Sequence, residues 1–74
     1  MDATEAILAV LSSEPGSEMH WTVIWDRALR AGHIDPLADP EAREGFLRAL
    51  AAAARTGLIE KTSTGTYRLP ATGR

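Results

Sequence analysis

The side chains that could bind a metal or carry out acid–base catalysis are few and poorly placed. The 74-residue chain has no cysteine and two histidines, His20 and His33, which stand on either side of a predicted helix and fit no zinc-ligand spacing. No serine has the flanking pattern of a nucleophile elbow, and no glycine-rich loop follows a predicted strand. We therefore expect no catalytic residue, no metal and no cofactor, and we interpret His20 as a structural polar residue beside the second helix.

Cations and hydroxyls in the second half of the chain offer a different chemistry, which is contact with phosphate. Lys and Arg supply the charge for such contacts, and Ser and Thr supply further hydrogen-bond donors. Double-stranded DNA is therefore the expected partner. The candidate residues are Arg43, Arg48 and Arg55 on the predicted third helix, and Lys61, Ser63, Thr64 and Arg68 on a predicted hairpin.

The charge balance predicts weak to moderate binding. The net charge is −2, whereas a DNA-binding domain is usually basic. Residues 1–18 carry four acidic side chains and no basic one, while residues 58–74 carry three basic side chains and one acidic one, so the basic end of the chain is the hairpin. Glu44 stands one helical turn before Arg48 and is placed to pair with it, which would neutralise part of the third helix.

A second interpretation is a protein-interaction module. Ala51 and Ala52 flatten the outer part of the third helix, and such a surface suits a partner helix or a second copy of the chain better than a phosphate backbone. The acidic first half of the chain also suits a partner with a basic surface. The sequence leaves both interpretations open: DNA binding, and association with a protein or with itself through the third helix.

The elements that must position these residues begin with a capped helix. Asp2 and Glu5 have the spacing of a capping box, in which each side chain accepts a hydrogen bond from the backbone of the other residue. Apolar residues then recur at spacings of three and four, as on one face of a helix. The segment Ser12 to Ser17, which contains Pro15-Gly16, is expected to end this helix.

The second helix is predicted from the stretch "MHWTVIWDRALRAG", in which Gly32 stands where a left-handed cap would stop the helix. In a second interpretation of its start, Met19 to Trp21 is extended and Thr22 is the cap, which makes a short third strand available. We interpret both tryptophans as core residues rather than as base-stacking residues. The predicted apolar side contains Trp21, Ile24, Trp25, Ala28 and Leu29.

The third helix and the hairpin follow two Asp-Pro pairs. Asp39 as cap and Pro40 at the first helical position predict the start of the helix, and Gly57 predicts its end. The runs 58–62 and 66–69 favour strands and are separated by a short turn, 63–65, that contains Gly65. Tyr67 is expected to pack on the third helix. The predicted buried side of that helix contains Phe46, Leu47, Leu50, Ala53 and Ala54.

Particular residues along this pattern carry a family resemblance. They are "AILAVL" (6–11), Met19-His20-Trp21, Ile24, Ala28-Leu29, Gly32, Ile34, Asp39-Pro40-Glu41 and Gly65-Thr66-Tyr67-Arg68-Leu69. In these positions the chain resembles the HARE-type winged helix-turn-helix, a small module of restriction endonucleases, of the bacterial RNA polymerase delta subunit and of some eukaryotic chromatin proteins. The resemblance implies a DNA-associated module with an auxiliary or regulatory role in transcription. The run of basic and aromatic residues that often precedes the wing in this family is missing.

The expected architecture is therefore mainly α with a small β-hairpin: a winged helix-turn-helix with three helices and a C-terminal wing. We expect one winged-helix domain over residues 1–70 and a flexible C-terminal tail over residues 71–74. The first residues are acidic where a secretory signal would be basic, and no segment approaches the roughly 20 apolar residues that span a bilayer. A cytoplasmic location without membrane contact is expected.

Overall fold

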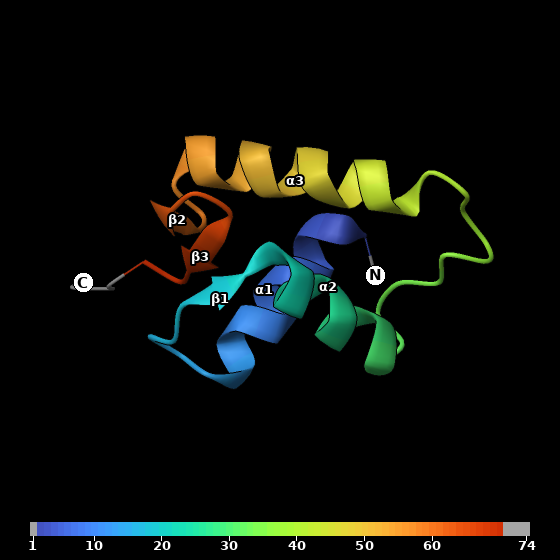
Figure 1. Cartoon of the computed structure of the whole chain (residues 1–74), viewed down its shortest axis with the longest axis horizontal. Coiled ribbons are helices and arrows are strands. Elements are labelled where there is room, and N and C mark those ends of the chain that lie inside the picture. Colours follow the sequence, from blue (N-terminus) through green and yellow to red (C-terminus); the bar gives the residue numbers. More distant parts are fainter. Residues whose placement is uncertain (1, 71–74) are drawn as a thin grey trace.

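Three helices and a three-stranded antiparallel sheet make up the chain in the computed structural model, which describes residues 2–70 (Figure 1). The sheet and the end of the third helix lie at one end of the long axis, and the loop before that helix lies at the other end. The predicted fold class, a mainly helical winged helix with a C-terminal wing, is confirmed. The predicted tail, residues 71–74, lies outside the described residues. The elements are α1 (Ala3–Ser13), β1 (Met19–His20), α2 (Trp21–Arg30), α3 (Ala42–Thr56), β2 (Glu60–Ser63) and β3 (Thr66–Arg68).

The first helix begins with the predicted capping box. The backbone nitrogen of Glu5 donates to Asp2 Oδ1 over 2.8 Å, and the backbone nitrogen of Asp2 donates to Glu5 Oε1 over 3.1 Å. These bonds satisfy donors that the first turn of a helix leaves free. The helix ends at Ser13, within the predicted segment. Its buried residues are Ala6, Ile7, Val10 and Leu11.

The start of α2 differs from the interpretation in which Thr22 is the cap. His20 is the N-cap: its Nδ1 accepts a hydrogen bond from the Thr22 backbone nitrogen over 3.3 Å. The reason is the sheet, because the Trp21 nitrogen donates to the Gly65 carbonyl over 2.8 Å and so fixes His20 at the point where the strand ends. The short strand predicted before α2 is confirmed as β1. Gly32, with φ of 78°, follows α2 as predicted.

The start of α3 was predicted too early. The helix begins at Ala42 rather than at Pro40 because Asp39 forms a separate turn. Its Oδ1 accepts from the Glu41 nitrogen over 2.9 Å, and its carbonyl accepts from the Ala42 nitrogen over 3.0 Å. Glu41 is therefore the N-cap and lies outside the helical region of backbone angles. Gly57, with φ of 86°, closes the helix as predicted.

The hairpin is shorter than predicted. Leu58 and Ile59 are not in the first strand, because their backbone nitrogens donate to the Ala53 carbonyl over 2.9 and 3.3 Å and so complete the end of α3. The turn consists of residues 64–65, and Ser63 belongs to β2. The central strand is β3, which pairs with β2 on one side and with β1 on the other, with Met19 opposite Tyr67.

The core lies between α1, α2, α3 and the inner face of the sheet, with α3 packed chiefly on α1. Phe46 is fully buried and packs edge to face on Trp25, with the two ring centroids 5.1 Å apart. Tyr67 is buried as predicted. Trp21 and Trp25 both pack against the core, as predicted. The prediction for Leu47 was wrong, since it is 38% exposed. Leu47 lies about 100° around α3 from Phe46, on a side that no other element covers fully.

A close approach at the tip of the hairpin requires glycine. Gly65 has φ of 77°, and a Cβ there would lie 2.8 Å from His20 Nε2. We expect Gly65→Ala to lower the free energy of unfolding by about 2–3 kcal/mol. Backbone strain from an alanine at a positive φ adds to the cost of the clash between its methyl group and the His20 ring. Urea denaturation measures the change. Gly16→Ala is the matched control, since Gly16 has φ of 84° in open space and only the strain applies. Equal losses in the two variants would contradict the clash.

Candidate nucleic-acid interface

The three arginines of α3 are all exposed, and the helix fixes their relative directions. Arg48 and Arg55 are seven residues apart, so they lie within about 20° of one another around the axis and about 10 Å apart along it. Arg43 lies about 140° from Arg48 around the axis, and its guanidinium lies over the ring of Trp21 in α2. The helix therefore presents one pair of aligned cations, with a third cation nearer its start and well around the axis from them.

The first strand of the hairpin adds a fourth cation to this side. Lys61 lines the same shallow depression as Ala54 and Gly57, so it lies beside the last turn of α3. It pairs across the ladder with Tyr67, and paired residues project from the same face of a sheet. Since Tyr67 is buried against the helices, Lys61 projects toward α3. We call the resulting surface the basic face; it consists of Arg43, Arg48, Arg55 and Lys61.

The four cations of the basic face differ from the other basic residues of the described chain because they form no ion pair there. Four ion pairs form within residues 2–70, and none of them includes a residue of the basic face. The pair expected between Glu44 and Arg48 is not formed in this part of the chain. The pairs are Arg27 with Glu14 (2.5 Å), Arg30 with Asp26 (2.8 Å), Arg68 with Glu60 (2.7 Å) and Arg68 with Glu18 (3.6 Å).

Arg68, the remaining basic candidate of the hairpin, lies on the other face of the sheet. It pairs across the ladder with Glu60, the residue before Lys61, so the alternation of a strand directs it away from α3. Its Nε donates to Glu60 Oε1, and its side chain is 37% exposed. The Glu60 carboxylate, through this hydrogen bond and its charge, and to a lesser degree Glu18, raise the pKa of Arg68. The guanidinium of Arg68 is thus already bound to carboxylates.

The start of α3 is joined to the start of α2 and to the wing by an aromatic contact. The guanidinium carbon of Arg43 lies 5.2 Å from the centre of the Trp21 ring, a distance suited to a cation–π interaction. The same ring lies near Gly65 at the hairpin turn. Ser63, the last residue of β2, and Thr64 in the turn are both exposed. The helical spacing that placed Trp21 on the apolar side of α2 gave no signal for its contact with Arg43.

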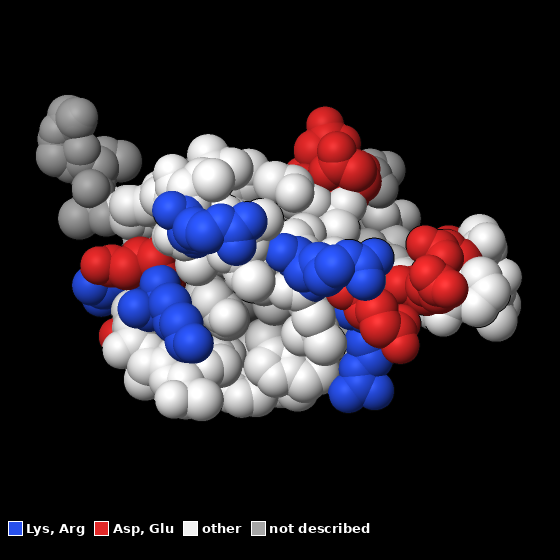
Figure 2. All heavy atoms as spheres, turned by 90° about the horizontal axis from the view of Figure 1, so that it is seen from above, with Lys and Arg blue, Asp and Glu red and all other residues white. Residues whose placement is uncertain are grey.

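Apart from the carboxylate of Glu44, the surface between the cations is largely uncharged. Figure 2 looks onto the α3 side and shows separate groups of basic side chains with uncharged surface between them. Leu47 and Ala51, which lie between Arg43 and Arg48 around the helix, are both exposed. Acidic side chains gather at the right-hand end of this view, where the loop before α3 lies. The basic face is therefore bounded by acidic surface at one end.

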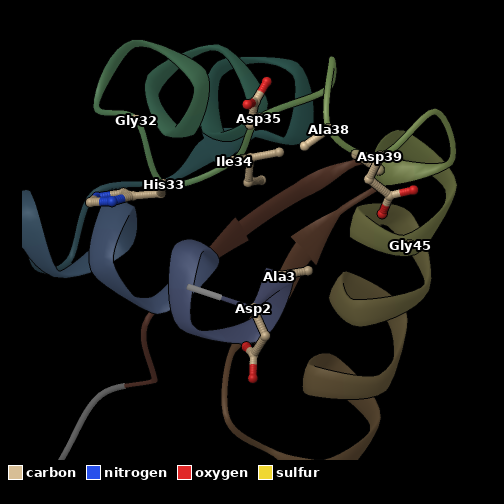
Figure 3. Close-up of a pocket in the computed structure, with 10 residues that line it drawn as sticks. Asp2, Ala3, Gly32, His33, Ile34, Asp35, Ala38, Asp39 and Gly45 are labelled. Atoms are coloured by element: carbon tan, nitrogen blue, oxygen red, sulfur yellow. The ribbon is translucent and has the colours of Figure 1, made fainter.

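A cleft between α1, the loop before α3 and the start of α3 contains three carboxylates but does not bring them together (Figure 3). Asp2, Asp35 and Asp39 point in different directions, and each accepts a hydrogen bond from a nearby backbone nitrogen. His33 also lines this cleft. Within residues 2–70 no three His, Cys, Asp or Glu side chains are placed to hold a metal ion.

Comparison of the sequence with protein-family models and with curated proteins, and of the structure with solved structures, finds no match. Within the described residues, no helix has the length and apolar character that a membrane span requires.

Proposed function

We propose that this protein is a small winged-helix module that binds double-stranded DNA through the basic face, with modest affinity and strong sensitivity to salt. One observation carries this proposal. Among the basic residues of the described part of the chain, those of the basic face have no carboxylate partner there, while Arg27, Arg30 and Arg68 are all ion-paired. A cation that is not already neutralised is the group that a phosphate can bind.

The geometry suits contact with the phosphate backbone more than reading of bases. Helix-turn-helix proteins reach base edges chiefly with the first residues of the recognition helix. At the start of α3 these positions include the N-cap Glu41 and Glu44 in the first turn, whose carboxylates repel phosphate and have no cation partner within residues 2–70. Arg48 and Arg55 lie farther along the helix. We therefore propose binding that depends little on sequence, with Lys61 and the turn hydroxyls as further contacts.

Protein binding through α3 is the second candidate. The observation in its favour is a strip of apolar residues that remain exposed on the α3 side: Leu47 at 38%, Ala51, and Leu58 at 50%. These residues lie four and seven positions apart, so they follow one side of the helix and its end. A partner helix or a second copy would cover this strip and thereby also cover Arg55.

A titration followed residue by residue by NMR separates the two candidates. We expect a mixed-sequence duplex at low salt to shift the resonances of the basic face and of Ser63 and Thr64. These shifts should fade at physiological salt, where the Debye length is about 8 Å. The absence of shifts at low salt would contradict DNA binding. Shifts at Leu47, Ala51 and Leu58 that depend on protein concentration alone would favour association through α3.

A further inference from the structure

The two ends of the long axis carry opposite and complementary features. One end is the loop before α3, where Leu37 is 94% exposed. The other end holds a shallow depression between the last turn of α3, the start of β2 and the end of the chain's described part. The molecule is 38 Å long and about 20 Å across, so the two ends are well separated. The depression is lined by Ala54, Gly57, Ile59, Glu60, Lys61 and Pro70.

The loop holds Leu37 outward in a defined turn. The Leu37 nitrogen donates to Asp35 Oδ1 over 3.0 Å, and the Ala38 nitrogen donates to the Asp35 carbonyl over 3.1 Å. Pro36 between them restricts the backbone further. Single exposed apolar residues are common on protein surfaces, but a nearly fully exposed leucine in a turn closed by hydrogen bonds is a preformed apolar projection.

The charges around the two features are also complementary. Residues 31–42 contain three acidic side chains, Asp35, Asp39 and Glu41, and no Lys or Arg. In the depression, Lys61 has no carboxylate partner within residues 2–70, while Glu60 is neutralised by Arg68. The acidic residues around the apolar projection are thus complementary to the unpaired cation of Lys61 in the depression, an arrangement that favours one orientation of approach.

We infer that copies of this chain associate head to tail, with Leu37 of one copy seated in the Ala54–Lys61 depression of the next. The contact joins two different surfaces, so it does not close on itself and leads to open chains of copies rather than to a symmetric dimer. The contact is small, and we expect a Kd of about 1 mM or somewhat lower, as for weak contacts. This association needs no DNA and does not depend on the proposed function.

Sedimentation velocity at low salt, without DNA, tests the inference. From about 20 µM to 2 mM, a range that brackets the expected Kd, the mean mass of the wild type should rise above the 8.0 kDa monomer and continue past the dimer. Leu37→Ser removes the projection, and Lys61→Glu reverses a charge at the depression. Each variant alone should remain monomeric, because each lacks one of the two surfaces. Both positions are exposed, and circular dichroism should show an unchanged fold.

The decisive sample is an equal mixture of the two variants. Each supplies the surface that the other lacks, so the mixture should form a dimer of one copy of each and nothing larger. Val23→Ser, at an exposed valine on α2, is the control and should associate like the wild type. The inference is overturned if the wild type stays monomeric throughout, if its mass stops at a dimer, if Leu37→Ser associates like the wild type, or if the mixture remains monomeric.

Discussion

Replacing Arg48, Arg55 and Lys61 together by glutamine is expected to weaken binding of a mixed-sequence duplex at low salt by at least about 100-fold. Each cation that contacts a phosphate releases counterions, so the slope of log affinity against log salt should fall by about 0.9 per contact, or about 2.7 for three. Glutamine keeps much of the length of each side chain. Arg43 is left in place because its contact with Trp21 could affect the fold.

The matched control is a second triple variant, Arg27, Arg30 and Arg68 to glutamine, which removes the same total charge. All three guanidinium groups are already bound to carboxylates, so we expect this variant to keep its affinity within about threefold. Fluorescence anisotropy with a labelled duplex at several salt concentrations measures both variants. Equal losses would mean that net charge alone controls binding, and the basic face would then have no special role. The comparison also tests Arg68, which sequence reasoning included among the phosphate-binding candidates.

Sequence patterns were sufficient for the features that depend on near neighbours. The capping box of Asp2 and Glu5 joins residues three apart, and the glycines after α2 and α3 have backbone angles that few other residues adopt. The alternation of apolar and polar residues around Tyr67 also depends on near neighbours and predicted the wing, because a strand places every second residue on one face. The predicted element order is confirmed.

Contacts between distant residues were not accessible from such patterns. Arg68 meets Glu18 across fifty positions of sequence, and Arg43 meets Trp21 only because α2 and α3 pack in one particular way. The start of α3 was predicted too early because Asp39 accepts the Glu41 backbone hydrogen bond in a separate turn and does not act as the cap of the helix. The candidate cations of α3 were identified correctly as exposed, but the division between paired and unpaired cations required the three-dimensional arrangement.

The core that holds the basic face in place should depend strongly on Phe46. It is fully buried and packs edge to face on Trp25, so Phe46→Ala removes a large apolar surface and leaves a cavity. We expect a loss of about 3–5 kcal/mol in the free energy of unfolding. A domain of this length has a total of roughly 4–11 kcal/mol, so this loss removes between about a quarter and all of the stability, and the unfolded fraction should rise sharply.

Urea denaturation followed by circular dichroism and by tryptophan fluorescence measures this loss, and Leu47→Ala on the same helix is the control. Leu47 is next in sequence but 38% exposed, so we expect its truncation to cost about 1 kcal/mol or less. Similar losses at the two positions would contradict the orientation of α3 about its own axis, in which Phe46 faces the core and Leu47 faces solvent. This orientation of α3 matters for the proposed binding, because burying Phe46 places Arg48 and Arg55 on the opposite, exposed side of the helix. If DNA binding uses the basic face, Phe46→Ala should weaken binding in step with its unfolded fraction although no cation is changed, whereas Leu47→Ala should preserve the fold that presents those cations.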